Sequence, residues 1–194
     1  MITKFGSLFA GHVDLDNIGF EGTPVNDRWL SDDHLATVLD KTEAIVTTMD
    51  RLGYSTFWAA EHRFQREGYE CLPNLVQPGL WPATQTTRLK FGCAFNVLPM
   101  WHPVRLAEDY AMADIMTGGR VIMGVGRGYH SREVESFGAP VLDNAANKEL
   151  FEEQMDVLMK CFDEESWSHR GKQYTIPPAV PYRGYELKEV TCVP

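Results

Sequence analysis

The sequence predicts an α/β protein in which parallel strands alternate with helices that cover them. The first observation is a series of apolar runs, each too short for a helix, at residues 4–10, 55–60, 89–97 and 121–125. The second is a helical spacing of apolar residues between these runs. The third is that the connections are short, which favours a parallel sheet. Four such units fit either a small doubly wound sheet or half of a (β/α)8 barrel.

The first helix has recognisable signals at both ends. Ser31 is a suitable N-cap, and Asp32 and Asp33 favour the positive end of a helix. Gly53 suits the left-handed residue that follows a helix. The face expected to be buried consists of Leu35, Val38, Leu39, Thr42, Ile45, Val46, Met49 and Leu52.

The later helices carry weaker signals. Pro78 and Pro82 are expected to kink or split a helix over residues 73–87. Pro103 suits the first turn of the next helix, which stops at Gly118. Its apolar face is expected to be Val104, Ala107, Ala111 and Ile115. A last helix follows Asp143, with the apolar positions Phe151, Met155, Leu158 and Phe162.

The C-terminal tail is less regular. Residues 172–176 are expected to form a short strand, and residues 186–193 read as the start of another. The chain stops at Pro194 without a closing helix, which suggests a fragment of a longer frame. Residues 1–194 are expected to form a single domain.

Composition and charge exclude several classes of protein. The chain has 27 acidic residues against 18 Lys and Arg, a net charge of −9 and no basic stripe. This balance argues against nucleic acid and anionic membranes as partners. The four cysteines are scattered, without a Cys-x-x-Cys pair, as in reduced cytosolic proteins. We therefore expect a cytoplasmic protein.

The stretch from Gly118 to Gly138 organises the rest of the chain. A buried strand at 121–125 opens into Gly126-Arg127-Gly128, where two glycines permit close backbone approach and the arginine offers a fork of donors to an anion. Tyr129 stands where a dinucleotide-binding fingerprint requires its last glycine, so that fingerprint is not met. The alternative for Arg127 is a surface arginine, or one paired with Glu133 or Glu135.

Polar side chains follow each of the predicted strands. They are His12, the Glu61-His62-Arg63 run, Asn96, His102, Arg127 and His130. One chemistry is a metal site that activates water, but no His-x-His pair is present and the arginines would repel a cation. The other is an anionic cofactor whose phosphate meets Arg127 while His62 handles a proton near the reactive ring.

Several stretches share their order and spacing with a known family. They are Trp58-Ala-Ala-Glu-His-Arg-Phe64, Leu98-Pro-Met-Trp-His-Pro-Val-Arg-Leu-Ala-Glu-Asp109 and Gly118-Gly-Arg-Val-Ile-Met-Gly-Val-Gly-Arg-Gly-Tyr129. In these the chain resembles the bacterial luciferase-like flavin-dependent monooxygenases, essentially over its whole length. The resemblance implies a (β/α)8 TIM barrel, of which this chain holds about the first four units. It implies reduced FMN as cofactor, and O2 activation through a flavin C4a-hydroperoxide that oxygenates a small organic substrate.

The resemblance also assigns roles to individual residues. It implies that His62, with Glu61, is catalytic, and that Arg63 replaces a second histidine found in many members. It implies flavin-binding roles for Arg127, Gly126 and Gly128, and for Lys148, which stands where a second phosphate-binding arginine is usual. The flavin-facing edge would be Ala94-Phe95-Asn96, where members often carry a non-prolyl cis peptide.

Two other functions stay open at this point. One is an F420-dependent oxidoreductase of the same superfamily, and the other is a non-catalytic flavin-binding or oligomer-forming fragment. A separate NAD(P)H:flavin reductase would supply the reduced flavin, and a homodimer or other oligomer is expected. Because half of the barrel is expected to lie beyond Pro194, we expect the chain alone to bind flavin weakly or not at all.

Overall fold

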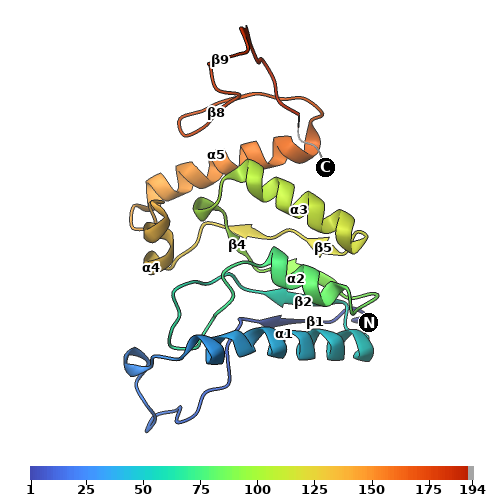
Figure 1. Ribbon diagram of the computed structural model, residues 1–194, viewed down its shortest axis with the longest axis vertical. Helices are drawn as coiled ribbons and strands as arrows, with labels where there is room; N and C mark the ends of the chain where they lie inside the picture. Colours follow the sequence, from blue (N-terminus) through green and yellow to red (C-terminus); the bar gives the residue numbers. More distant parts are fainter. Residues whose placement is uncertain (192–194) are drawn as a thin grey trace. The chain divides into compact units, whose positions relative to one another are not determined.

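The computed structural model describes residues 1–191, which separate into two compact units (Figure 1). Unit 1 comprises Met1–Asn96 and Ala113–Val125, and unit 2 comprises Val97–Met112 and the chain from Gly126 onward. Each unit is described by itself. The single domain over residues 1–194 stays a prediction.

Unit 1 is built around a parallel sheet of four strands in the order β1-β2-β3-β5. Its elements are β1 (Gly6–Phe9), η1 (Val25–Asp27), α1 (Asp32–Leu52), β2 (Thr56–Ala59), α2 (Val76–Ala83), β3 (Lys90–Cys93) and β5 (Val121–Ile122). In register, Phe9 pairs with Ala59, and Ala59 pairs with Cys93. The carboxyl ends of three strands therefore meet at one edge, and the predicted α/β class with a parallel sheet is confirmed.

Helix α1 forms as its end signals predict. The Ser31 side chain accepts a hydrogen bond from His34 N, and Gly53 follows in the left-handed region with φ +82°. The buried stripe consists of Val38, Thr42, Val46 and Met49. Two residues expected on that face, Leu39 and Leu52, are 40% and 60% exposed. The expected face was therefore too wide, because only the central stripe of the helix packs on the sheet.

The proline-containing helix is short but not split. Helix α2 has eight residues and includes both Pro78 and Pro82. Pro78 is its third residue, where the missing N–H has no partner within the helix in any case. Pro82 falls in the last turn, so one helical hydrogen bond is lost shortly before the helix ends. The expected split is therefore wrong, because both prolines lie near the helix ends, and the expected kink stays a prediction.

Two strands that the sequence predicts as continuous are interrupted. The 89–97 run divides into β3 and β4 (Asn96–Val97), with a cis peptide between Ala94 and Phe95. The 121–125 run divides into β5 and β6 (Val125–Gly126) around Gly124. A Cβ on Gly124 would lie 1.9 Å from the Cys93 carbonyl oxygen, so the backbone passes too closely for any side chain.

Unit 2 is mainly helical. Its elements are η2 (Leu98–Met100), most of α3 (Pro103–Thr117), α4 (Ser131–Val134), η3 (Glu135–Phe137), α5 (Asn144–Asp163), β7 (His169–Arg170), β8 (Thr175–Ile176), β9 (Pro181–Tyr182) and β10 (Tyr185–Glu186). Both long helices lie where the sequence predicts them, but their expected faces were partly wrong. On α3, Leu106 and Tyr110 are buried while Ile115 is 64% exposed, and on α5 Phe162 is 43% exposed.

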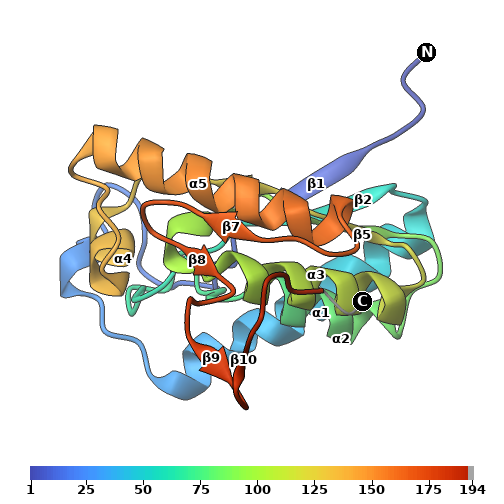
Figure 2. The ribbon, with the colours of Figure 1, turned by 90° about the horizontal axis from the view of Figure 1, so that it is seen from above.

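The antiparallel hairpin β7–β8 lies along α5 (Figure 2). Glu153 of α5 holds it by accepting hydrogen bonds from the backbone N–H groups of Lys172, Gln173 and Tyr174. The strand expected over 172–176 forms in part as β8. The strand expected over residues 186–193 lies partly within the described residues, where Val190 forms an antiparallel bridge with Trp167. Cys192 lies outside the described residues.

Two findings concern the helices and the cysteines of the described residues. No helix in residues 1–191 is long and apolar enough to cross a membrane. Cys71, Cys93 and Cys161 form no disulfide.

Candidate functional site

The run after β2 places a buried carboxylate in a network of partners. Glu61 is 2% exposed, and its Oε2 accepts a hydrogen bond from Asn96 Nδ2 at 3.0 Å. Its Oε1 forms an ion pair with Arg63 at 2.5 Å. A buried charge is tolerated when it is paired and hydrogen-bonded in this way. We call Glu61, Arg63 and Asn96 the carboxylate–arginine cluster, and it fixes the chain on both sides of His62.

His62 itself is 7% exposed and faces a second carboxylate. Its Nε2 lies 3.4 Å from Oε1 of Glu70, and its backbone N–H donates to the Leu72 carbonyl at 3.0 Å. A hollow of about 320 Å³ adjoins it, lined among others by Arg63, Phe64 and Gln65. His62 therefore combines an ionisable partner with a space large enough for part of a small molecule.

The expected flavin-facing edge lies at the break between β3 and β4. The Ala94 N–H donates to the Ala59 carbonyl at 2.7 Å, and the Asn96 N–H donates to the Gly124 carbonyl at 2.8 Å. Asn96 is completely buried and Phe95 is 39% exposed. The structure thus brings Asn96 to the Glu61 carboxylate, while Phe95 retains an exposed ring.

Arg127 lies in unit 2, in the loop between β6 and α4. Its guanidinium donates to Asn144 Oδ1 at 3.1 Å, and its carbonyl accepts from Asn147 Nδ2 at 3.3 Å. The expected alternative, pairing with a glutamate, is replaced by this contact with the first turn of α5. The first-turn amides of Ala145 and Ala146 already donate to the Asp143 side chain. An anion at this place would therefore be held by the guanidinium and the loop rather than by the helix end.

The Gly126-Arg127-Gly128 loop requires glycine at position 128. Its φ is +77°, and a Cβ there would lie 2.5 Å from Val97 Cγ1 and 2.8 Å from Val134 Cγ2. Glycine is thus required both by backbone conformation and by space. Gly126 ends β6, so the loop begins directly at Arg127.

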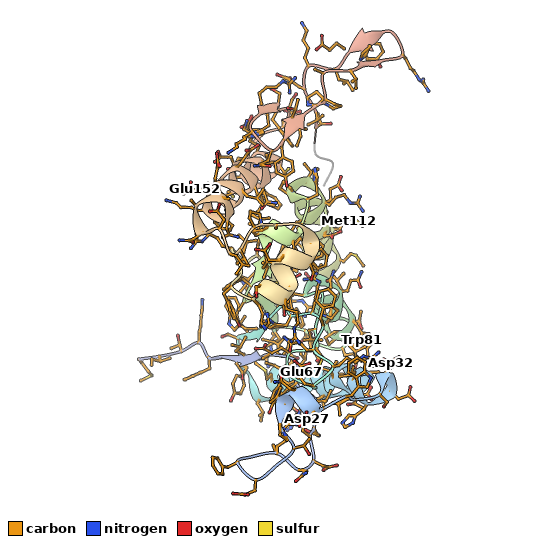
Figure 3. The ribbon with its side chains drawn as sticks, turned by 90° about the vertical axis from the view of Figure 1, so that its left-hand side faces the viewer. Asp27, Asp32, Glu67, Trp81, Met112 and Glu152 are labelled. Carbon is orange, nitrogen blue, oxygen red and sulfur yellow. The ribbon has the colours of Figure 1, made fainter. Side chains whose placement is uncertain are left out.

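Lys148, one of the expected cofactor-binding residues, lies on an exposed helix face. It is 64% exposed at the side chain and lies 3.5 Å from Glu152, one turn further along α5. Glu152 projects from α5 in Figure 3. An ion pair of this kind on an exposed helix face contributes little, so Lys148 remains available to an anion.

The other histidines at the strand ends are His12, His102 and His130, and the first two pack against aromatic rings. The His12 ring packs on Phe9 with centroids 5.0 Å apart, and the His102 ring meets Tyr174 edge-on at 5.3 Å. Burial lowers the pKa of His102. His130 is the N-cap residue of α4. Within residues 1–191 no group of three metal-binding side chains exists, which gives the metal-site alternative no support.

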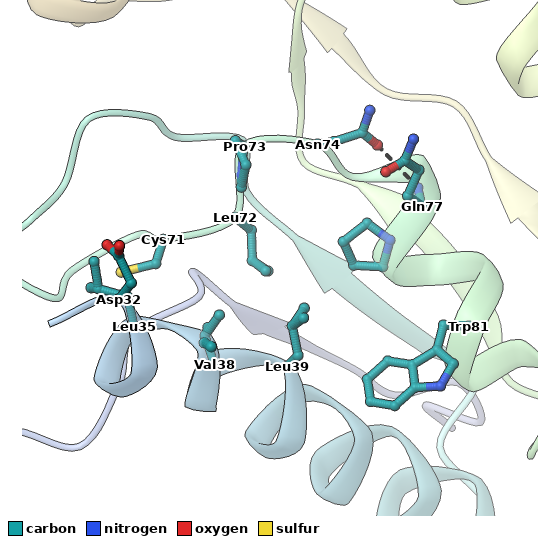
Figure 4. A pocket seen from close by; sticks show the side chains of 12 residues that line it. Asp32, Leu35, Val38, Leu39, Cys71, Leu72, Pro73, Asn74, Gln77 and Trp81 are labelled. Carbon is teal, nitrogen blue, oxygen red and sulfur yellow. Dashed lines mark hydrogen bonds between the residues drawn. The ribbon is translucent and has the colours of Figure 1, made fainter.

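An apolar groove lies between α1 and α2 (Figure 4). Its volume is about 510 Å³, and Leu39, Leu72 and Trp81 are among its walls. It shares Asp32 and Cys71 with the hollow beside His62. Burial, together with Glu67 and Glu70, raises the pKa of the Cys71 thiol to about 11, so this thiol stays protonated and is no nucleophile at neutral pH.

With this geometry in view, comparisons with known proteins decide the family. The sequence profile described as luciferase-like monooxygenase matches residues 22–186. The chain belongs to the luciferase-like monooxygenases. The alkanal monooxygenase alpha chain of the Kryptophanaron alfredi symbiont is 34% identical over 125 residues, which are 64% of this chain and 34% of the relative. The oxygenase component of the flavin-dependent trigonelline monooxygenase of Acinetobacter baylyi is 28% identical over 66% of this chain and 34% of its own length.

Solved structures show the same fold. The oxygenating constituent of 3,6-diketocamphane monooxygenase from Pseudomonas putida, in complex with FMN, superposes with a TM-score of 0.74 at 20% identity. The match covers 96% of this chain and 47% of that one. A coenzyme F420-dependent tetrahydromethanopterin reductase from Methanopyrus kandleri gives a TM-score of 0.53 at 16% identity, over 79% and 42% of the two chains. The luciferase-like chain thus spans about a third to a half of the length of these proteins.

Sequence reasoning missed some of the partners that complete the site. Glu70 stands eight residues after His62, in a loop whose sequence has no periodicity that would link the two. Asn144 and Asn147, which hold Arg127, look like ordinary residues of a first helical turn. Their adjacency arises only when the loops fold back on the chain.

Proposed function

We propose that this chain is part of a flavin-dependent monooxygenase that uses O2 and reduced FMN to oxygenate a small organic substrate. The observation that carries the proposal is the family match over residues 22–186. An FMN complex among the structures of the same fold supports the choice of flavin. The residues of this chain fit such a cofactor, because a guanidinium and a glycine loop suit a phosphate and a buried histidine suits proton handling.

Bound reduced FMN would supply the activation of O2 and the transfer of one oxygen atom. The chain's own residues have simpler tasks. Arg127 would bind the phosphate, with Lys148 as an additional cation and Gly126 and Gly128 giving the backbone access. His62 would hold or move a proton near the flavin ring, and the carboxylate–arginine cluster keeps the His62 backbone in place. Ala94, Phe95 and Asn96 are the residues that would contact the flavin ring.

A relative described as an oxygenase component supports a division of labour. We infer that a separate NAD(P)H:flavin reductase delivers the reduced flavin. An alkanal and a diketocamphane, the compounds after which two of the similar proteins are named, are the first substrates to test. Association into a homodimer or other oligomer, and a cytoplasmic location, remain predictions.

The deciding experiment is His62→Ala in the natural protein that carries this sequence. With reduced FMN supplied directly and isotope-labelled O2 present, we expect incorporation of label into product to fall about a hundredfold. FMN binding should stay within about twofold of the wild type, because His62 is not assigned to the phosphate. His130→Ala, which removes a histidine whose side chain makes no capping hydrogen bond to α4, is the control. Undiminished label incorporation in the His62 variant would remove this histidine from the mechanism.

A second candidate function is F420-dependent hydride transfer, which the likeness to the tetrahydromethanopterin reductase favours. The two differ in their need for O2. Turnover that consumes O2 in step with product supports the monooxygenase, and turnover that persists without O2 supports the F420 enzyme.

A further inference from the structure

The apolar groove between α1 and α2 adjoins the hollow beside His62. Both spaces lie within unit 1, and the wall residues that they share are Asp32, Leu35, Cys71 and Pro73. The groove has a volume of about 510 Å³ and the hollow one of about 320 Å³. Sites for small molecules usually measure roughly 300–1,000 Å³ and have mostly apolar walls. The two spaces together therefore offer an elongated molecule more room than the hollow alone.

The groove has two different ends. Figure 4 shows Asp32 and Cys71 at one end and Trp81 at the other, with Leu72 between them. Asp32 and Cys71 also line the hollow, whereas Trp81 does not. The hollow therefore lies at the Asp32 end, and the groove runs from it toward the indole on α2.

Large apolar side chains along the groove remain exposed after the chain has folded. Leu39 of α1 and Trp81 of α2 are 40% and 41% exposed, and both line the groove. Single exposed apolar side chains are common on proteins, but a contiguous exposed set marks a surface that binds something. An apolar chain lying in the groove would remove both side chains from water at once.

The groove walls carry little charge. Among the described residues that line the groove, Asp32 is the one charged side chain, and its Oδ1 forms an ion pair with Arg66. Burial, together with Glu67 and Glu70, raises the pKa of the Cys71 thiol to about 11, so this thiol is also uncharged at neutral pH. Such walls give a charged chain little compensation for the water that it would lose. The groove therefore favours an uncharged, apolar occupant.

We propose that the groove between α1 and α2 binds the apolar tail of an elongated, uncharged substrate whose reactive end lies in the hollow beside His62. This inference rests on the proposed function, in which His62 acts near the reacting atoms. It narrows the substrate class, because an unbranched alkanal can extend along the groove toward Trp81. A compact molecule such as a diketocamphane would use the hollow without the groove.

Binding of unbranched alcohols to the full chain tests the groove without flavin or turnover. In calorimetric titrations of hexanol, octanol and decanol, we expect the affinity to rise about fourfold for each added CH2 group. Trp81→Ala should weaken decanol binding about tenfold and leave hexanol binding within about twofold of the wild type, because the indole lies at the far end of the groove.

A second pair of variants separates the groove from exposed apolar surface in general. Leu39→Asn should weaken decanol binding about tenfold. Leu52→Asn changes a leucine of the same helix that is also exposed but does not line the groove, and it should have no effect. Since both leucines are exposed, the two variants should retain the wild-type melting temperature within a few degrees.

Three outcomes of these titrations overturn the inference. One is an affinity that does not rise with chain length, and another is an equal effect of Leu39→Asn and Leu52→Asn. The third is self-association of the chain that Leu39→Asn abolishes while no alcohol binds, which would assign the groove to a second copy of the protein.

Turnover supplies the second measurement. In the natural full-length protein supplied with reduced FMN, Trp81→Ala should lower kcat/KM for decanal about tenfold, mainly through KM, because the indole contacts the tail and not the reacting atoms. The loss for a diketocamphane should be much smaller, and equal losses for the two substrates would contradict the inference. Decanol binding with the expected length dependence, but no oxygenation of either substrate, would support the groove and overturn the proposed function instead.

Discussion

At the scale of single residues, the site depends on contacts between positions that are distant in sequence. Glu61 and Asn96 are 35 positions apart, yet their side chains share a hydrogen bond of 3.0 Å in a buried place. Arg127 and Asn144 are 17 positions apart and share a hydrogen bond of 3.1 Å at the surface of unit 2. The types of residue at strand ends were predictable, because polar side chains in such places are visible in the sequence. Their partners were not, because nothing in local spacing determines where a loop returns.

The glycine at position 128 allows a matched test of steric fit. Gly128→Ala should lower the free energy of unfolding by about 1–3 kcal/mol, because the new Cβ collides with Val97 and Val134 at a positive φ. Gly118→Ala is the control, since Gly118 has φ +67° with nothing within 4 Å of its Cβ position. Thermal unfolding of both variants isolates the collision from the backbone strain. Equal losses in the two would show that the Val97–Val134 contact is not the constraint.

At the scale of elements, side-chain carboxylates bind backbone N–H groups and so connect one element to another. Asp50 near the end of α1 accepts from the N–H groups of Thr87, Arg88 and Leu89 just before β3. Glu153 does the same for the hairpin after α5. Helix positions and most strand positions follow from periodicity and end signals. These connections do not, because a carboxylate on a helix reads in sequence as part of a solvated face.

The Glu153 connection predicts a pH dependence. Burial opposes ionisation of Glu153, but the N–H groups of Tyr174, Gln173 and Lys172 and the His169 ring outweigh it and lower its pKa below the usual 4.5. Its stabilising contribution is therefore complete above about pH 4.5 and is lost as the pH falls through the lower pKa of the folded state.

Glu153→Gln should accordingly destabilise the hairpin by about 1.5–3 kcal/mol at neutral pH and much less in acid. Hydrogen exchange of the Gln173 and Tyr174 amides at several pH values measures the effect. Glu152→Gln, on the exposed face of the same helix, should leave that exchange unchanged. Equal protection in the Glu153 variant and the wild type would contradict the assigned role.

At the scale of the whole molecule, the chain covers only part of the fold of its relatives. It spans 47% of the FMN-bound neighbour that it superposes on with a TM-score of 0.74. A (β/α)8 site collects its groups from the ends of several strands around the barrel. A chain with this much of the fold should therefore hold flavin through only part of a phosphate and ring site.

We expect the 194-residue chain by itself to bind FMN with a dissociation constant well above the micromolar range. Flavin fluorescence titration checks this expectation, and a micromolar constant with a stoichiometry near one would contradict it. Any binding that is detected should fall about tenfold or more in Arg127→Ala, through loss of charge-assisted hydrogen bonds. Arg105→Ala removes an exposed arginine paired with Glu108 and should have no effect.

The sequence by itself determined the α/β class, the parallel order of strands and helices, and the strand ends at which the candidate site residues lie. Those features follow from local rules of periodicity, capping and glycine placement, which act within a few residues. Only the tertiary structure decided that β3 and β4 break at Ala94–Phe95, that Glu61 binds Arg63 and Asn96, and that Glu70 faces His62. The physical reason is that hydrogen bonds and ion pairs depend on distances in space, which loops create between residues that no sequence period connects.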